Sequence, residues 1–182
     1  ANADARDKFG LGAIHKARRR PLIEELLRRG VDINGSAWCY GWAPIHYASF
    51  HGNSERMEIL LELGALLRVE GKRGEGPLHV AAGTIHGASK VIDLLVQAGA
   101  DLEARDKTGA TPLLWALGVG SHVARMLRGS EEFAIHLVEN GANVSVADNE
   151  GNCAKEVASK REYKKLLQRM KMRTENDRTG SL

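Results

Sequence analysis

Three histidines recur at nearly regular intervals and are the residues best suited to chemistry. His15, His46 and His79 each stand fourth in a short motif, reading GAIH, APIH and GPLH. Imidazole nitrogens bind zinc at about 2 Å, so three histidines can form a metal site if the fold brings them together. Whether they converge depends on the helices and turns that carry them.

Residues 76–114 contain one complete structural unit and the start of the next. A glycine and a proline open a short apolar helix, and Gly87 breaks it. The next helix carries apolar residues at helical spacing between Val91 and Leu95, and Gly99 ends it as a left-handed C-cap. A helix pair this short cannot bury its apolar face alone, so we expect it to stack on copies of itself.

The copies are visible along the chain. The opening recurs as GAIH, APIH, GPLH, TPLL and a degraded CAKE, and the exit of the second helix recurs as LLRRGVD, LLELGAL, LLVQAGAD and LVENGAN. Five turn glycines lie 31, 33, 35 and 42 residues apart, namely Gly10, Gly41, Gly74, Gly109 and Gly151. A period of about 33 residues with a TPLH-type opening resembles the ankyrin repeat.

This resemblance implies an all-α solenoid of helix-turn-helix units joined by β-hairpin-like turns, with the terminal repeats as caps. We expect one domain over residues 1–172, and a disordered tail over 173–182 because Leu182 is the only apolar side chain in that segment. The five expected repeats cover 4–34, 35–67, 68–102, 103–144 and 145–172. The first residues resemble the end of a preceding repeat, which predicts that the polypeptide belongs to a longer chain.

The same resemblance assigns the histidines a structural role. An imidazole at this position is expected to hydrogen-bond the backbone of a neighbouring turn. Stacked repeats would also hold His15, His46 and His79 about one repeat apart, too far for a single ion. We therefore predict no metal site.

No other pattern points to catalysis. The sequence has no evident nucleophile and base pair, no Gly-rich phosphate loop after a strand and no CxxC motif. We expect a non-catalytic protein without cofactor or small-molecule substrate.

The segment LLRRGVDIN, ending at Asn34, also resembles the ankyrin motif that an asparaginyl hydroxylase modifies in animal cells.

The family's partner-contacting positions flank each turn glycine and face inward from the first helix. Carried over by position, the predicted binding residues are Phe9, Tyr40, Trp42, Phe50, Lys72, Arg73, Glu75 and Lys107. The stripe is aromatic in repeats 1 and 2 and basic in repeat 3. It suits a partner protein or peptide with an apolar anchor followed by acidic residues.

The turn before repeat 2 is unusually aromatic. It reads GSAWCYGW, with one extra residue relative to the other turns. We predict that Tyr40 and Trp42 form an exposed anchor for the partner. Trp38 has two interpretations: it belongs to the exposed set, or it folds back onto repeat 1, whose first helix is short.

Repeat 4 carries about nine extra residues between its helices, in the segment LGVGSHVARMLRGSEE. Insertions in solenoids often carry function, so one interpretation is a functional, mobile loop with trypsin sites at Arg125 and Arg128. The other is a longer first helix with a looser connection. Both remain open from the sequence.

Positive charge is concentrated at the C-terminus. Residues 155–182 hold nine Lys and Arg against four Asp and Glu, a net of +5, and the whole chain is +3, so the remainder is −2. A binder of nucleic acid or anionic membrane through this basic helix is therefore one alternative. Another is a regulatory module of a larger enzyme or channel. We expect the basic run 16–20 to be a solvated surface.

The two cysteines, Cys39 and Cys153, stand in different repeats. A disulfide between them is not expected in a linear stack, which favours a reducing compartment, cytoplasmic or nuclear. No apolar run reaches the ~18 residues of a membrane-spanning helix. We expect a monomeric domain.

Overall fold

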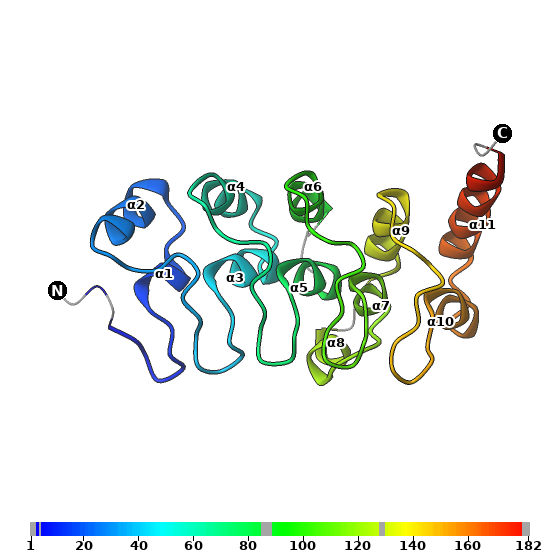
Figure 1. The fold of residues 1–182 in the computed structure, drawn as a ribbon, viewed down its shortest axis with the longest axis horizontal. Helices are drawn as coiled ribbons and strands as arrows, with labels where there is room; N and C mark the ends of the chain where they lie inside the picture. The colour runs from blue at the N-terminus through cyan, green and yellow to red at the C-terminus, as the bar shows by residue number, and fades with distance from the viewer. Residues whose placement is uncertain (1–2, 4, 85–88, 128–129, 180–182) are drawn as a thin grey trace.

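The computed structural model describes residues 3, 5–84, 89–127 and 130–179, with side chains described as far as Arg173. These residues form α-helices and isolated β-bridges, with no strand among them. The helix break predicted at Gly87 lies outside the described residues. Figure 1 shows the helices stacked side by side along one axis, from the N-terminal to the C-terminal end.

The helices form two layers. The inner layer contains α1 (Ala13–Lys16), α3 (Pro44–Phe50), α5 (Pro77–Gly83), α7 (Pro112–Ala116) and α10 (Ala154–Lys160). The outer layer contains α2 (Arg20–Arg28), α4 (Ser54–Glu62), α6 (Ser89–Gln97), α9 (Glu131–Glu139) and α11 (Lys164–Thr179). One further short helix, α8 (His122–Leu127), lies in the insertion of repeat 4. The all-helical solenoid predicted from the repeats is confirmed.

Local sequence signals set the helix ends. Pro44, Pro77 and Pro112 each stand in the first turn of an inner helix, where the missing N–H costs nothing and φ is already helical. Outer helices are followed by glycines with positive φ, for example Gly64 at 88° and Gly99 at 89°. This left-handed conformation is strained for other residues, so the C-cap predicted at Gly99 is confirmed.

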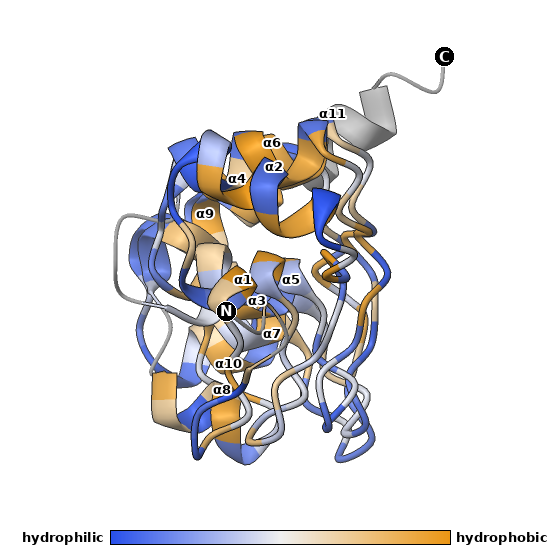
Figure 2. Ribbon diagram, turned by 90° about the vertical axis from the view of Figure 1, so that its left-hand side faces the viewer, coloured by the Kyte–Doolittle hydropathy of each residue, from blue (hydrophilic) through white to orange (hydrophobic). Residues whose placement is uncertain are grey.

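The core lies between the two layers, and Figure 2 shows hydrophobic helix faces meeting there. Each outer helix turns one apolar stripe inward, such as Val91, Ile92 and Leu95 of α6, all with 0% exposure. At the C-terminal end, Leu166 and Met170 of α11 are buried as well, and α11 packs on α9 and α10. The last repeat therefore covers the apolar side of the one before it.

The C-terminal segment differs from the sequence prediction. In place of the disordered tail expected over 173–182, the structure continues α11 to Thr179. Once a helix is nucleated, each further residue adds one backbone hydrogen bond without a new nucleation cost. A polar segment can therefore extend a helix that packing has already anchored at Leu166 and Met170.

Hairpin-like turns precede the inner helices and project away from both layers (Figures 1 and 2). A backbone hydrogen bond closes each one, and we call them fingers 1 to 5: residues 7–11, 37–42, 71–75, 106–110 and 148–152. Four fingers join residues four apart, whereas in finger 2 the Ala37 N–H donates to Trp42 O, five residues on. The extra residue predicted in this turn is confirmed. We call the side enclosed by the fingers and the inner helices the concave face.

Candidate docking surface

Backbone hydrogen bonds join each finger to the next. The Cys39 N–H donates to Phe9 O at 3.3 Å, Lys72 N–H to Tyr40 O at 2.7 Å and Lys107 N–H to Arg73 O at 2.8 Å. Asn149 N–H continues the series by donating to Thr108 O at 2.9 Å. The fingertips therefore form a connected row rather than independent loops, and the residues beside each turn glycine lie next to one another along the stack.

The N-terminal part of this row exposes aromatic side chains. Trp38 is 61% exposed, Phe9 51% and Tyr40 39%. The Lys8 ammonium lies 5.1 Å from the centroid of the Phe9 ring, close enough for a cation–π contact. Large exposed aromatics in a row are typical of a surface that another molecule covers.

The middle of the row is basic. Lys72, Arg73 and Lys107 are exposed, and the Lys107 ammonium donates to Lys72 O at 2.8 Å, which holds it across two fingers. Acidic side chains of the same fingers are withdrawn: Glu75 and Asp106 are buried, and half-buried Asp7 pairs with Lys16 at 2.6 Å. This pairing, mainly the hydrogen bond from Lys16, lowers the pKa of Asp7 to about 2. The exposed charges of fingers 1 to 4 are thus positive.

Trp42 corrects one prediction. We expected it to be exposed beside Tyr40, but it is 3% exposed and belongs to the core. Its ring stacks on His46, with 6.1 Å between centroids, and lies 5.7 Å from Phe50. Its Nε1–H donates to Glu75 Oε1 at 2.7 Å. The exposed pair is Trp38 and Tyr40. Trp38 also contacts repeat 1, because a methyl group on Gly10 of finger 1 would lie 2.4 Å from Trp38 Cγ, so it packs on that finger while remaining 61% exposed.

Glu75 corrects a second prediction, because it is 1% exposed and cannot contact a partner. In fingers 1, 4 and 5 an aspartate three residues before the turn glycine accepts backbone N–H groups of its own turn. Finger 3 has Gly71 there, and a methyl group on Gly71 would lie 2.4 Å from Glu75 Cδ. Glu75 therefore fills the space of the missing aspartate, and its Oε2 accepts the Arg73 N–H at 2.9 Å.

Phe50 lies where the concave face meets the core. It is half-buried and packs against core residues, so it offers part of one ring face to a ligand. Tyr47, one turn earlier in α3, is also half-buried. Burial and the Cys39 thiol, whose Sγ lies 3.7 Å from the Tyr47 hydroxyl, raise the pKa of that hydroxyl. Tyr47 was not among the predicted residues, although its place one helical turn before Phe50 would have indicated it.

The three histidines join adjacent repeats. Each Nδ1 accepts the N–H of the residue before its helix, Gly12, Ala43 or Gly76, at 3.1 to 3.2 Å. Each Nε2–H then donates to a carbonyl of the next repeat. The pairs are His15 with Gly35 at 2.8 Å, and His46 with Glu75 and His79 with Ala110, both at 3.1 Å. Because backbone groups occupy both nitrogens, these rings serve as structural links.

Burial keeps these rings neutral. It lowers the pKa of His46 to about 4 and lowers the pKa of His15 and His79 as well. A neutral ring with one donor and one acceptor nitrogen is what the two backbone bonds require. Among the described residues, no group of three or more His, Cys, Asp or Glu side chains is arranged to hold a metal ion.

One buried arginine was not identified from the sequence. Arg56 is 3% exposed, and its Nη2 donates to the carbonyls of Ile14 and His15 at 3.2 and 2.8 Å. These carbonyls lie in the last turn of α1, where positive charge is favoured. Burial lowers the pKa of Arg56 to about 10. Nothing in the local pattern distinguishes Arg56 from an exposed arginine, because its partners are more than forty residues away.

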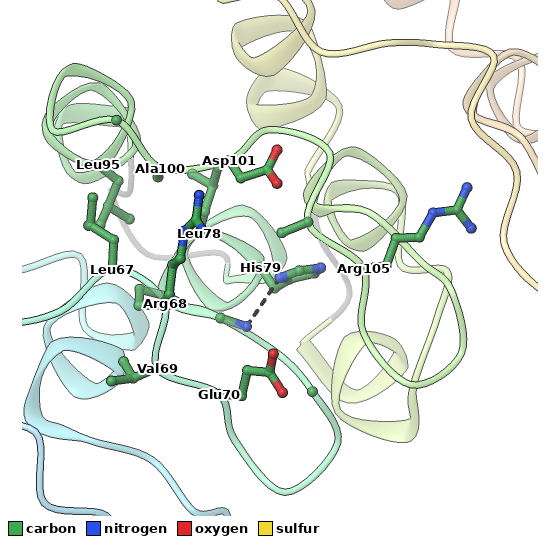
Figure 3. Close-up of a pocket in the computed structure, with 15 residues that line it drawn as sticks. Leu67, Arg68, Val69, Glu70, Leu78, His79, Leu95, Ala100, Asp101 and Arg105 are labelled. Carbon is green, nitrogen blue, oxygen red and sulfur yellow. Dashed lines mark hydrogen bonds between the residues drawn. The ribbon is translucent and has the colours of Figure 1, made fainter.

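Figure 3 shows a pocket of about 360 Å³ between the exits of repeats 2 and 3. Apolar side chains and two residues of each charge line it, namely Leu67, Val69, Leu78, Leu95, Arg68, Arg105, Glu70 and Asp101. The equivalent space in repeat 1 measures about 150 Å³ and contains Arg6, which donates to Gly10 O and Ser36 O. Glu70 replaces that arginine in repeat 3. The balanced charges favour no particular class of ligand.

The fold and the finger row define a class: a linear stack of helix-turn-helix units that presents a connected surface of turns. The sequence profile described as Ankyrin repeat matches residues 40–71 and 73–107. Residues 40–71 and 73–107 thus form ankyrin repeats, and the fold of the described residues is an ankyrin-repeat solenoid. Ankyrin repeats generally serve as protein-interaction modules.

Several curated proteins are similar to parts of the chain. Ankyrin repeat and SOCS box protein 3 of Bos taurus is 43% identical over 51 residues, which are 28% of this chain and 10% of that protein. Ankyrin repeat, SAM and basic leucine zipper domain-containing protein 1 of Dasypus novemcinctus is 46% identical over 44 residues, 24% of this chain and 9% of that protein.

A third relative is a channel. The transient receptor potential cation channel subfamily A member 1 homolog of Caenorhabditis elegans is 32% identical over 73 residues, 38% of this chain and 6% of that protein. The matches thus span a tenth or less of the length of these three relatives.

Within the described part of the chain, no helix combines the length and apolar character needed to cross a membrane.

Proposed function

We propose that the chain docks a partner protein or peptide on its concave face, across fingers 1 to 4 and the exposed side of α3. The partner supplies an apolar side chain for Phe9, Trp38 and Tyr40, and acidic residues for Lys72, Arg73 and Lys107. Binding is by docking alone, without a chemical step. The partner is still one with an apolar anchor followed by acidic residues, as predicted from the sequence. Among the contact residues, Trp42 and Glu75 are removed and Trp38 is added.

The proposal rests on which side chains of the fingers are exposed and which are buried. Trp38 is 61% exposed while Trp42, four residues later, is 3% exposed. The acidic groups of fingers 3 and 4 point into the protein and the basic groups point out. Exposed aromatics beside a charged rim resemble the hot spots of protein interfaces.

A peptide-display selection on the immobilised chain tests the proposal with a defined ligand. Enriched peptides should combine an aromatic or aliphatic residue with several Asp or Glu. Synthetic versions are then titrated against the wild type and against Trp38→Ala/Tyr40→Ala and Lys72→Glu/Arg73→Glu. Each double variant should weaken binding by about 30-fold or more, the equivalent of about 2 kcal/mol.

Matched controls separate this surface from others. Leu66→Ala removes an apolar side chain that is 58% exposed outside the fingers, and Lys165→Glu reverses an exposed charge on α11. Neither should alter affinity. If the selected peptides bind both finger variants as tightly as the wild type, docking at the fingers is refuted.

Two further candidates each have one supporting observation. The match to a cation channel favours a regulatory module within a larger protein. Deleting these repeats from that larger protein and measuring the change in its activity would test this candidate. The exposed lysines of α11 favour an anionic ligand. Binding of duplex DNA or anionic vesicles that Lys165→Glu abolishes, with a steep salt dependence, would establish that function instead.

A further inference from the structure

The insertion in repeat 4 is a packed element rather than a loose connection. Its helix α8 buries Val123, Ala124 and Leu127, at 9% exposure or less, and contacts the inner helices α5 and α7. Figures 1 and 2 place α8 on the side of the inner layer opposite the outer helices, at the level of the fingers. It therefore occupies the concave face of repeats 3 and 4, while Arg128 and Gly129 lie outside the described residues.

Finger 4 holds the start of this insertion. Asp106 Oδ2 accepts the Ser121 N–H at 3.3 Å and the Trp115 Nε1–H at 2.9 Å. Gly120 packs so closely on finger 4 that a methyl group there would lie 2.8 Å from Ala110 Cβ. The end of the insertion is tied back by the Ser130 N–H, which donates to Ala116 O at 2.8 Å.

The inner helices are shaped to receive α8. A methyl group on Gly83, the last residue of α5, would lie 3.2 Å from Leu127 Cδ1 and 3.1 Å from Trp115 Cε3. Every residue of α5 and of α7 is buried. In α3, by contrast, Tyr47 and Phe50 remain half-exposed on the concave face. The inner layer is therefore closed at α5 and α7, next to the accessible side of α3.

We propose that α8 is a built-in occupant of the concave face, which closes the inner helices of repeats 3 and 4 to partners, leaves the tips of fingers 3 and 4 exposed and forms the end wall of the docking surface. The inference rests on the proposed function and deepens it by setting the extent of the partner. The exposed side of α8 carries His122, Arg125 and Met126, three residues at helical spacing. Arg125 adds a positive charge on α8 to those of Lys72 and Arg73 on finger 3, so we assign the acidic end of the partner segment to the side of the site next to α8.

The wall also limits the length of that segment. From finger 1 to finger 4, against which the insertion packs, there are three repeat spacings. Packed helices lie about 10 Å apart, which gives roughly 30 Å. An extended chain covers about 3.3 Å per residue, so about nine residues fill the site. The partner therefore inserts one short extended acidic segment rather than a surface spanning all five repeats.

The first experiment uses a peptide selected on the wild-type chain. Trimming it to its best ten residues should leave affinity unchanged, and the variant Arg125→Glu/Met126→Ser should weaken it at least tenfold. The matched control is Arg169→Glu/Met172→Ser, which changes the same two residue types on the exposed side of α11. All variants are first compared by thermal melts.

The outcomes separate this inference from the function on which it rests. If the finger variants lose binding but the α8 variant keeps it, the end wall is refuted and the finger surface stands. If neither set loses binding, the proposed function fails. A requirement for more than about fifteen residues would also overturn the inference, since such a segment would pass beyond α8.

A second measurement needs no ligand. In Trp38→Phe the two remaining tryptophans, Trp42 and Trp115, are 3% and 0% exposed, so acrylamide should quench little fluorescence. Adding Leu127→Asp should unseat α8 and raise quenching at least twofold while circular dichroism retains the helical signal. If Trp115 stays shielded in a variant that still folds, α8 does not cover this face and the inference is wrong.

Discussion

Fingers 3 and 4 each bury a carboxylate that accepts a tryptophan indole N–H, but the two carboxylates come from different positions in the turn. In finger 4, Asp106 stands before the turn glycine and accepts the indole N–H of Trp115, which follows it in the same repeat. In finger 3, Glu75 stands after the turn glycine and accepts the indole N–H of Trp42, from the preceding repeat. A longer side chain on the opposite side of the turn thus reaches the same space. The comparison shows that the fold requires a buried acceptor there, and not a particular position for it.

The histidines extend the parallel. His46 donates to Glu75 O beneath finger 3, and His79 donates to Ala110 O beneath finger 4. Each ring also touches the tryptophan that donates to the carboxylate of that finger, with 6.1 Å between the centroids of His46 and Trp42 and 5.5 Å for His79 and Trp115. A histidine, a tryptophan and a carboxylate therefore join two repeats at both places.

The largest effect is expected in finger 4. Asp106→Ala should lower the free energy of unfolding by about 3–5 kcal/mol, because it leaves several buried N–H groups without an acceptor, at about 1–3 kcal/mol each. Those donors include Thr108, Ala110 and Ser121. Urea unfolding measures the change, with Asp101→Ala on the exposed surface as the control. Equal stability of the two variants would contradict the role assigned to Asp106.

Acidification tests the histidines beneath both fingers. Their pKa values are lowered in the folded state, to about 4 for His46 against an ordinary 6.5. Between those values the unfolded chain binds more protons, so stability is full above pH 6.5, falls with pH and levels off near 4. For His46 the loss is on the order of 3 kcal/mol at about 1.4 kcal/mol per pKa unit.

Urea midpoints measured between pH 7.5 and 4.5 provide the readout for this prediction. His46→Gln and His79→Gln should be less stable at neutral pH and should show a flatter pH profile than the wild type. A wild-type midpoint that does not change from pH 7 to pH 5 would show that these rings are not held neutral by burial.

Moving the carboxylate of finger 3 from Glu75 to position 71 tests whether the arrangements of fingers 3 and 4 are equivalent. Glu75→Ala should cost about 2 kcal/mol through the unpaired Trp42 indole and Arg73 N–H. Gly71→Asp alone should also destabilise, since its Cβ would lie 2.4 Å from Glu75 Cδ. Combined, the two changes recreate the arrangement of finger 4 and should recover at least half of the loss. Additive losses in the double variant, measured by urea unfolding, would disprove the equivalence.

The smallest effect concerns Trp38. Because this side chain is 61% exposed, Trp38→Ala should lower stability by about 0.5 kcal/mol, within the range of surface substitutions. Trp42→Ala in the same finger should cost about 3–5 kcal/mol as a core truncation. Parallel thermal melts compare the two, and similar losses would place Trp38 in the core rather than on the docking surface.

The sequence alone determined the repeat architecture. Pro at helix starts, glycines that accept positive φ and the spacing of apolar residues act within a few positions of each other, so they can be read without a structure. The extra residue of finger 2 was also visible, as a count against the other turns. Ankyrin resemblance further supplied the structural role of His15, His46 and His79, whose ring nitrogens all contact backbone.

Tertiary structure alone decided which side chains of the fingers are exposed. Trp42 is buried because Glu75, thirty-three residues later, accepts its indole N–H, and Glu75 turns inward because Gly71 leaves space for it. The insertion became the helix α8 because Gly83 and Asp106, from two other segments, provide a seat and an anchor for it. These contacts join residues distant in the chain, and burial is settled by such contacts rather than by the neighbours in sequence.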